Sequence, residues 1–353
     1  MKLALITDTH FGGRNDSQIF TDYFFKFWEE EFFPTVLKKK IKKVIHLGDI
    51  FDRRKFANIK TLNSFRERFI EWFEKNGVEL HIIVGNHDVY YKDTNRVNAP
   101  KEILGNRYKM VKIYEDPEVV SFGKRKILFL PWINRENGEK SMNLIDSKES
   151  SIVMGHLELS GFKMYRNSVC YHGMNHSVFD GYDLVMTGHY HHKSTVGNIA
   201  YLGSTYEITW SDYNDPRGFH IFDTNTLELE YHQNPHRIFH KIIYNDNGID
   251  TIEGLKKDFS YCKNSYVKVL VECKNNPYFF DKFIDSIQLQ EPFDLSIIED
   301  LNLSVEEEEI VNEAEDTVTT LNKYVDGLDV NNVNLERLKE VLMSLHREAI
   351  DLQ

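Results

Sequence analysis

The chain has 353 residues, of which 41% are hydrophobic and 13% aromatic, which is enough to bury a sizeable core and to form about two domains. No stretch approaches the roughly 18 uninterrupted apolar residues that a membrane helix requires, and the N-terminus lacks a basic leader and a small-residue cleavage site, so we expect a cytoplasmic protein. The three cysteines, Cys170, Cys262 and Cys273, form no CxxC pair, which argues against a disulfide framework and a thiolate zinc site.

The net charge of −12 is concentrated at the C-terminal end. Residues 291–353 hold 17 acidic and 4 basic side chains, so residues 1–290 carry 39 basic and 38 acidic ones. Phosphate contacts depend on local groups of Lys and Arg and not on the total charge. The near-neutral body therefore does not exclude a nucleic-acid partner.

The first two-thirds of the chain alternates short apolar runs with longer amphipathic segments. Buried strands are predicted at residues 2–7, 43–48, 79–85, 126–132, 151–155 and 183–188, and helices at 16–39 and 58–76. This alternation favours an α/β layered fold, in which active groups lie on loops at the carboxyl ends of strands.

Five of the predicted strands end in residue types that bind metals. The endings read DTH at 8–10, GDIFD at 48–52, GNHD at 85–88, GH at 155–156 and GHYHH at 188–192. A single His after a strand is more often an ordinary polar residue than a ligand. Five endings that supply Asp, Asn or His, four of them with an adjacent Gly that permits close backbone approach, predict a shared metal site.

The donor set indicates which metals fit and how many. Oxygen and imidazole donors without sulfur suit Mn²⁺, Fe²⁺ or Zn²⁺ and tolerate Mg²⁺, and the number of candidates exceeds what a single ion needs. Two ions roughly 3.5–4 Å apart can clamp a phosphoryl group during an in-line displacement. The pattern therefore predicts a two-metal site in which one carboxylate bridges the ions.

The ordered set D-x-H, G-D-x-x-D, G-N-H-D, G-H and G-H-x-H resembles the motifs of the calcineurin-like metallophosphoesterase superfamily. Its spacing is similar to that of the branch that contains the bacterial SbcD nucleases, the meiotic-recombination-eleven nucleases and the T4-type phage recombination subunits. The stretches GDIFDRRK, IVGNHDVYYK, GHLELSGF and NDPRGFHIFDT extend the resemblance over about residues 1–225. It implies a layered β-sandwich flanked by helices, a small α+β capping domain and a C-terminal helical tail.

The resemblance also implies a role for each motif residue. It assigns Asp8, His10, Asp49 and His191 to one ion, and Asp49, Asn86, His156 and His189 to the other. Asp49 would bridge the ions, His87 would be a catalytic imidazole that binds no metal, and Asp52 would orient His87. Both ions are expected to be divalent, with Mn²⁺ as the first expectation and Mg²⁺ as the alternative.

For function, the resemblance implies the nuclease subunit of a DNA end-processing complex in recombination, repair and replication, with 3′ to 5′ exonuclease action on duplex ends and endonuclease action on single strands. The metal motifs alone leave a phosphoprotein or small-molecule phosphatase open as the alternative. The location would be the host cytoplasm if a phage encodes the chain. Basic residues that follow the motifs are candidates for DNA phosphate contacts: Arg14, Arg53, Arg54, Lys55, Lys92 and Arg96.

The C-terminal third separates these alternatives, because a nuclease subunit of this type needs a DNA-facing domain and a docking element for an ATPase. Beyond the nuclease domain, residues 1–225, the segment 226–300 contains a predicted strand at 265–272, a helix at 277–288 and an apolar run at 293–298. These elements predict a small α+β unit, which resembles a capping domain in its position and size, with an extension of the core sheet as the alternative.

The acidic tail, residues 301–353, shows two apolar stripes at helical spacing. Ser304 and Glu307 form a predicted capping box for a first helix, and residues 326–334 supply a break before a second. The chain has no P-loop motif, so the ATPase must be another protein. The resemblance implies an SbcC-like coiled-coil ABC ATPase in an assembly with two copies of each subunit. We expect the tail to dock on it, with packing on this chain's own core as the alternative.

Overall fold

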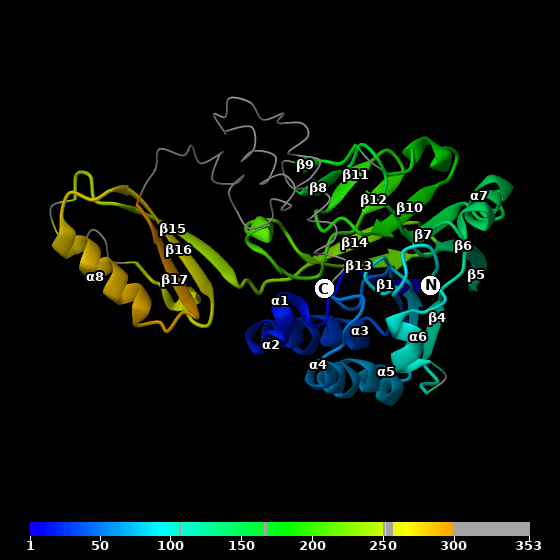
Figure 1. Ribbon diagram of the computed structural model, residues 1–353, viewed down its shortest axis with the longest axis horizontal. Helices are drawn as coiled ribbons and strands as arrows, with labels where there is room; N and C mark the ends of the chain where they lie inside the picture. The colour runs from blue at the N-terminus through cyan, green and yellow to red at the C-terminus, as the bar shows by residue number, and fades with distance from the viewer. Residues whose placement is uncertain (106, 166–167, 172, 250, 252–256, 300–353) are drawn as a thin grey trace, which may run out of the picture. The chain divides into compact units, whose positions relative to one another are not determined.

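The computed structural model describes residues 1–299 with the exception of 106, 166–167, 172, 250 and 252–256. The expected helices of the tail, residues 301–353, therefore lie outside the described residues. The chain divides into two compact units (Figure 1). The first comprises Met1–Ile208 and Asn214–Ile238, and the second comprises Thr209–Tyr213 and the residues from Phe239 onward.

The first unit contains two six-stranded mixed sheets. The first sheet has the strand order β14 (Leu229–Gln233), β13 (Gly218–Asp223), β1 (Lys2–Ile6), β2 (Lys43–His46), β3 (Glu79–Ile83) and β4 (Val111–Tyr114). Strands β1 to β4 are parallel, and β13 is antiparallel to both β1 and β14. The central strands are apolar and almost fully buried, as a sheet covered on both faces requires.

The second sheet has the order β11 (Ser194–Val196), β12 (Ile199–Tyr201), β10 (Leu184–Gly188), β7 (Ile152–His156), β6 (Arg125–Leu130) and β5 (Glu118–Phe122). Its four central strands are parallel, and the two edge strands are antiparallel to their neighbours. A hairpin of β8 (Lys163–Tyr165) and β9 (Ser168–Val169) and the short helix η3 (His176–Phe179) lie between β7 and β10 in the chain.

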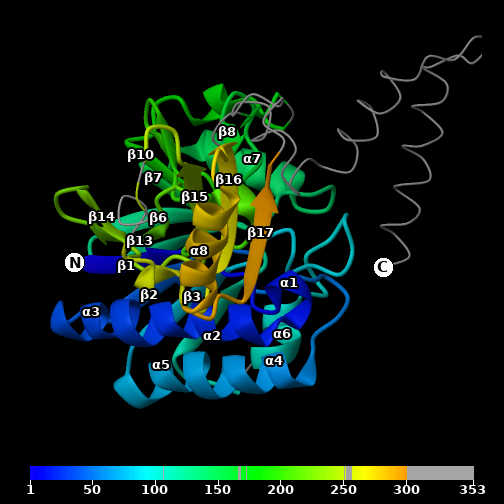
Figure 2. The ribbon, with the colours of Figure 1, turned by 90° about the vertical axis from the view of Figure 1, so that its left-hand side faces the viewer.

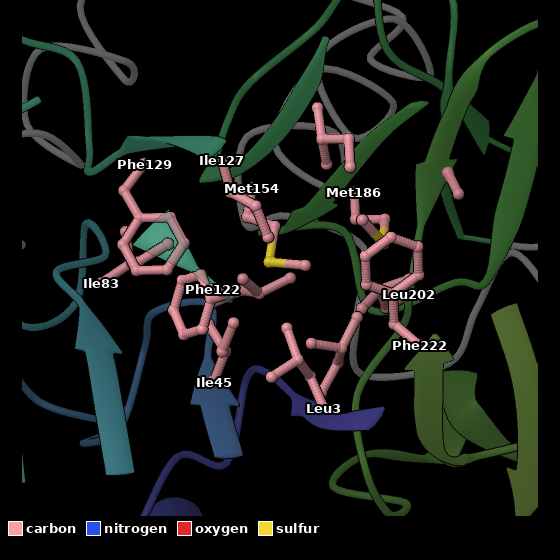
Figure 3. Packing of buried hydrophobic residues seen from close by; sticks show 14 of the residues in the cluster. Leu3, Ile45, Ile83, Phe122, Ile127, Phe129, Met154, Met186, Leu202 and Phe222 are labelled. Atoms are coloured by element: carbon pink, nitrogen blue, oxygen red, sulfur yellow. The ribbon is translucent and has the colours of Figure 1, made fainter. Parts of the chain in front are cut away.

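A hydrophobic core lies between the two sheets (Figure 3). Leu3 and Ile45 contribute to it from the first sheet, and Met154 and Met186 contribute from the second. Each of these side chains is fully buried, and burial of one such side chain contributes about 1.5–3 kcal/mol. This shared core holds the two sheets together, and with them the loops at their carboxyl ends.

Helices cover the outer face of the first sheet (Figure 2). One run comprises α1 (Gly13–Asp16), α2 (Gln18–Phe27), η1 (Trp28–Phe32) and α3 (Phe33–Lys38), and the next comprises α4 (Ile59–Ser64), η2 (Phe65–Ile70) and α5 (Glu71–Asn76). The two runs meet through aromatic rings, since the ring centroids of Trp28 and Phe69 are 4.9 Å apart. Helix α6 (Ala99–Leu104) precedes β4, and α7 (Gly138–Ser147) packs Ile145 against the outer face of the second sheet.

The second unit is a small α+β structure. Strands β15 (Phe239–Asn245), β16 (Tyr266–Cys273) and β17 (Asp294–Ile298) form a parallel sheet. The unit also contains α8 (Pro277–Gln288), which connects β16 to β17, and the short helices η4 (Trp210–Asp212) and η6 (Ser260–Cys262). Asn276 caps the start of helix α8, because its side chain accepts hydrogen bonds from the N–H groups of Tyr278 and Phe279. It packs Phe283 and Ile287 into the core of this unit.

The structure confirms the α/β layered sandwich flanked by helices. Each predicted strand and helix of the first 225 residues is present, with ends shifted by a few residues. Residues 229–233 form β14 in the first unit, which extends to Ile238, and the second unit comprises Thr209–Tyr213 as well as the residues from Phe239 onward. The division into a nuclease domain, a capping domain and a docking tail stays a prediction. Within the described part of the chain, no helix combines the length and the apolar character that crossing a membrane requires.

Candidate metal centre

The five motif loops meet at the carboxyl ends of the strands. Three loops follow the parallel strands β1, β2 and β3, and two follow the parallel strands β7 and β10. Main-chain hydrogen bonds join the first two loops, because Asp8 N–H donates to Gly48 C=O at 3.0 Å and His10 N–H donates to Asp49 C=O at 3.1 Å. The loops carry the seven expected ligands: Asp8, His10, Asp49, Asn86, His156, His189 and His191.

Asp8, His10 and His191 form the first of two clusters whose donor atoms lie within 4.8 Å of one another. His10 Nε2 is 3.0 Å from His191 Nε2. The Asp8 carboxylate is held by its neighbours, since its Oδ2 accepts hydrogen bonds from Thr7 Oγ1 at 2.7 Å and from His189 N–H at 3.2 Å. A buried carboxylate and two imidazoles therefore converge at one point.

Asp49, His156 and His189 form the second cluster. Asn86 adds an amide oxygen, because its Oδ1 lies 2.9 Å from His156 Nε2 and 2.9 Å from His189 Nδ1. Asp49 Oδ2 is 3.2 Å from His156 Nε2 and 4.0 Å from His10 Nε2 of the first cluster. The Asp49 carboxylate thus lies between the two clusters.

The buried carboxylates attract positive charge into the centre. Burial lowers the pKa of His10, but the hydrogen bond to Asp52 and the charges of Asp49 and Asp52 raise it to about 9. Burial also lowers the pKa of His156, but the charge and hydrogen bond of Asp49 raise it to about 9. Burial would raise the pKa of Asp49, but the charges of His156 and His87 hold it well below its usual range.

These residues fit a pair of divalent cations. The facing Nε2 atoms of His10 and His191, and the two imidazole nitrogens around the Asn86 amide oxygen, are arranged as donors to a shared ion would be. Oxygen and imidazole donors without sulfur suit Mn²⁺ and related borderline cations. A carboxylate placed between two such clusters is the arrangement that a two-metal site requires.

His87 lies beside the clusters and belongs to neither. Its Nδ1–H donates a hydrogen bond to the main-chain carbonyl of Asp52 at 2.6 Å, which leaves Nε2 as the free nitrogen of the ring. The family resemblance implies that the Asp52 carboxylate orients His87. Instead, Asp52 Oδ1 faces His10, 3.5 Å from Nδ1. Asp52 therefore contacts His87 through its main chain and His10 through its side chain.

Asp88, the last residue of the GNHD motif, connects two of the loops. Its buried carboxylate accepts hydrogen bonds from the N–H groups of Gly85, Asp49 and Ile50, each at 2.9 Å. The close approach requires glycine at position 85, because a Cβ there would collide with the Asp49 carboxylate. The motif contains Asp88, but nothing in the sequence shows which loop its carboxylate faces.

Four of the expected ligands have left-handed backbone conformations. The φ angles of Asp8, His10, Asp49 and His189 are 51°, 41°, 58° and 90°. This region costs a non-glycine residue roughly 1 kcal/mol or more, and it persists only where the surrounding structure holds it. The motif loops therefore sacrifice some stability to direct their side chains at the centre.

Trp132 lies against the second cluster, and no sequence motif singles it out. The centroid of its ring is 5.2 Å from that of His189 and 6.2 Å from that of His156. The main-chain N–H of Trp132 donates to the carbonyl of Val84 at 2.8 Å, and this bond joins the loop after β6 to the loop after β3. The sequence feature that could have identified Trp132 is its position at the carboxyl end of β6. This strand is parallel to β7, and active groups are expected at the carboxyl ends of such strands.

Arg53 and Arg96, two of the candidate phosphate-binding residues, are engaged in ion pairs within the chain. Arg53 pairs with Asp16, and Arg96 pairs with Glu136. Arg96 is 79% exposed and Glu136 is 36% exposed, and a pair at the surface contributes only about 0–1 kcal/mol. A phosphate group can therefore compete for Arg96, whereas Arg53 is held by Asp16, which is only 11% exposed.

Comparison with known proteins shows the family. A family model described as calcineurin-like phosphoesterase matches residues 1–193, and exonuclease subunit 1 of Enterobacteria phage T4 is 32% identical over 315 residues, which cover 88% of this chain and 89% of that protein. The chain belongs to the calcineurin-like phosphoesterase family.

Two further matches are more distant from this calcineurin-like phosphoesterase. A subunit of the SbcCD nuclease of Staphylococcus epidermidis is 24% identical over 260 residues, which cover 65% of this chain and 67% of that protein. Among solved structures, a dimetal phosphatase from Danio rerio aligns with 63% of this chain and 91% of its own, at 13% identity and a TM-score of 0.41.

Membership in the calcineurin-like phosphoesterase family confirms the resemblance drawn from the motifs, and it confirms the enzyme class, a phosphoesterase that uses divalent metal ions. The matched span contains all seven expected ligands together with Asp52 and His87. The role of each residue stays a prediction, as does the choice between Mn²⁺ and Mg²⁺.

Proposed function

We propose that the chain is the nuclease subunit of a DNA end-processing complex and that it hydrolyses DNA phosphodiester bonds. The observation that carries this proposal is the similarity to the phage T4 exonuclease subunit along most of both chains. A phosphatase that shared only the metal motifs would be similar over the motif region alone. The polarity proposed is 3′ to 5′ on duplex ends, with endonuclease action on single strands.

The two clusters would hold two divalent ions, with Mn²⁺ as our first choice and Mg²⁺ as the alternative. Asp8, His10 and His191 would bind one ion, Asn86, His156 and His189 the other, and Asp49 both. When bound, the ions would supply Lewis-acid stabilisation to the phosphoryl oxygens and lower the pKa of the attacking water.

The chain's own groups would orient the substrate and move a proton. Because Nδ1–H of His87 is engaged by the Asp52 carbonyl, Nε2 is the nitrogen that would face the substrate. In the imidazolium form of the ring, Nε2 would carry the second proton and donate it to the leaving oxygen. The Asp52 carboxylate, 3.5 Å from His10 Nδ1, would keep the His10 ring in position. Trp132 would cover the second cluster on the side of His189 and limit the access of water.

We propose further that this subunit works with an SbcC-like coiled-coil ABC ATPase, in an assembly with two copies of each chain. Both nuclease relatives are named as subunits, which supports a complex. Residues 1–225 would form the nuclease domain, 226–300 would cap the DNA, and the tail 301–353 would dock on the ATPase. The complex would act in the cytoplasm.

A digestion assay tests the nuclease assignment. The full chain is incubated with Mn²⁺ or Mg²⁺ and with linear duplex DNA, single-stranded DNA, p-nitrophenyl phosphate or a phosphopeptide. We expect cleavage of DNA that a chelator abolishes. Robust hydrolysis of the monoesters without DNA cleavage would overturn the proposal in favour of a phosphatase. Deleting residues 301–353 tests the docking role, since the product should stay soluble and metal-loaded but lose co-purification with the ATPase.

A further inference from the structure

Two loops beside the metal centre are joined by hydrogen bonds between their amide side chains and main chains. The first, residues 88–98, follows the GNHD motif, and the second, residues 131–137, follows β6 and includes Trp132. Asn95 Nδ2 donates to the carbonyl of Trp132 at 2.9 Å, and Asn134 Nδ2 donates to Asn95 Oδ1 at 2.8 Å. The first loop is therefore held in a defined position next to the second cluster.

The first loop buries its amides and exposes its aromatic rings. Asn95 and Asn98 are 5% and 1% exposed, and Asn98 Nδ2 donates to the carbonyl of Asn95 at 2.7 Å. Tyr90 and Tyr91, by contrast, are 43% and 52% exposed. A loop that only connected two elements would gain free energy by burying these rings. The two adjacent rings thus offer an aromatic surface that a ligand with flat, stacking groups can cover.

The two rings and their surroundings fit the bases of a nucleic acid. The ring centroids of Tyr90 and Tyr91 are 4.8 Å apart at an interplanar angle of 72°, so the pair presents ring faces in two directions. The same loop carries the cationic side chains of Lys92 and Arg96, both exposed. Aromatic faces beside cations are the combination that binds single strands without sequence preference, by base stacking and phosphate attraction.

The position of the pair connects it to the reaction centre. Tyr90 is three residues from His87, so their Cα atoms are at most roughly 11 Å apart. The loop is closed at its base, because Tyr90 N–H donates to Val97 C=O at 3.0 Å and Ala99 N–H donates to Asp88 C=O at 2.8 Å. The loop that carries the two tyrosines therefore begins at Asp88, and the Asp88 carboxylate holds the loop that contains Asp49.

We propose that Tyr90 and Tyr91 form a stacking platform for unpaired bases of a DNA strand whose phosphodiester lies at the metal centre. The inference rests on the proposed function and narrows its substrate to single strands and frayed ends. Inside a duplex each base already stacks on two neighbours and offers no free face, so the platform favours unpaired DNA, whose bases are accessible along the strand.

Binding of a fluorescent oligothymidylate to the full chain, measured by anisotropy with EDTA present, tests the platform without cleavage. Tyr90→Ser and Tyr91→Ser should each weaken binding by roughly 5- to 150-fold, the value of one stacked base. Tyr91→Phe keeps the ring and should bind like the wild type, whereas Tyr91→Leu keeps apolar area without the ring and should bind weakly. The dependence of affinity on salt should be unchanged in every variant, because tyrosine releases no counterions.

Val196→Ser is the matched control. Val196 is 50% exposed and pairs with Ile199, and Ile199 pairs with Val185 near the start of β10. Val196 therefore lies near the amino ends of the parallel strands of the second sheet, whereas the metal centre lies at their carboxyl ends. The control should bind oligothymidylate like the wild type. Wild-type affinity in both serine variants, or equal affinity of the wild type for oligothymidylate and for a blunt duplex, would overturn the platform. Failure of the wild type to cleave any DNA would instead overturn the proposed function, since the binding assay requires no cleavage.

Discussion

Replacing His87 with alanine should separate proton transfer from metal binding. His87 is in neither cluster, and Nδ1 of its ring donates a hydrogen bond to the Asp52 carbonyl and not to an expected ligand. The substitution therefore leaves all seven expected ligands in place. General acid catalysis typically contributes about 10²- to 10⁴-fold in rate, which corresponds to about 3–5 kcal/mol of transition-state stabilisation. We expect wild-type metal content and DNA cleavage slowed by that factor.

The assay compares two substrates and two measurements. Metal content is determined by atomic emission after Mn²⁺ loading and gel filtration, and cleavage rates are measured on linear DNA and on bis(p-nitrophenyl) phosphate. The nitrophenolate leaves without a proton, so His87→Ala should lose far less activity on that substrate than on DNA. Asp49→Ala is the control and should lose metal and both activities together. Loss of metal from His87→Ala, or an equal loss on both substrates, would refute the assignment of His87 as the proton donor.

Three further substitutions test the scaffold. Asp88→Ala removes the acceptor of three buried N–H groups around the Asp49 loop, so urea denaturation should show a loss of about 3–5 kcal/mol, and calorimetry should show weaker Mn²⁺ binding. The hydrogen bond from Lys43 lowers the pKa of Glu79 to about 2, below its ordinary value of 4.5. The Glu79 carboxylate therefore stabilises the fold above about pH 5 and loses this effect as the pH falls toward 2. The free energy of unfolding of Glu79→Gln should be lower than that of the wild type by about 1 kcal/mol near neutral pH, since the Glu79 side chain is 30% exposed, and a difference that does not shrink in acid would contradict the assignment. Ile287→Ala truncates a fully buried side chain of α8 and should destabilise the second unit by about 2–5 kcal/mol in thermal unfolding.

Much of the fold could be predicted because its local signals agree with its tertiary structure. The buried parallel strands are short apolar runs, and each motif starts where such a run ends. Helix α8 was predicted over 277–288, the residues that it occupies, because Asn276 and Pro277 mark its start and its apolar residues recur at helical spacing. Residues 229–233 carried no comparable signal, since β14 is a half-buried edge strand that pairs only with β13.

The orientation of the site residues could not be predicted, because it depends on how each loop turns. The family resemblance placed Asp52 near His87, but whether its carboxylate or its carbonyl makes the contact depends on the backbone at Asp49, which is left-handed at φ 58°. Trp132 was missed for a related reason. Trp132 is a lone aromatic residue that follows a strand, and no motif surrounds it in the sequence. Its ring lies beside His189 because β6 pairs with β7.

The path of the chain between the two units affects how a shortened protein should be designed. The segment Thr209–Tyr213 belongs to the second unit, although the residues before and after it belong to the first. Within that segment, Trp210 is 7% exposed and packs on Phe239, with ring centroids 4.6 Å apart. A stop codon after Ile238 would remove Phe239 and expose the indole ring of Trp210 to solvent. The shortened protein would therefore be prone to aggregate. A usable truncation must also replace residues 209–213 with a polar linker.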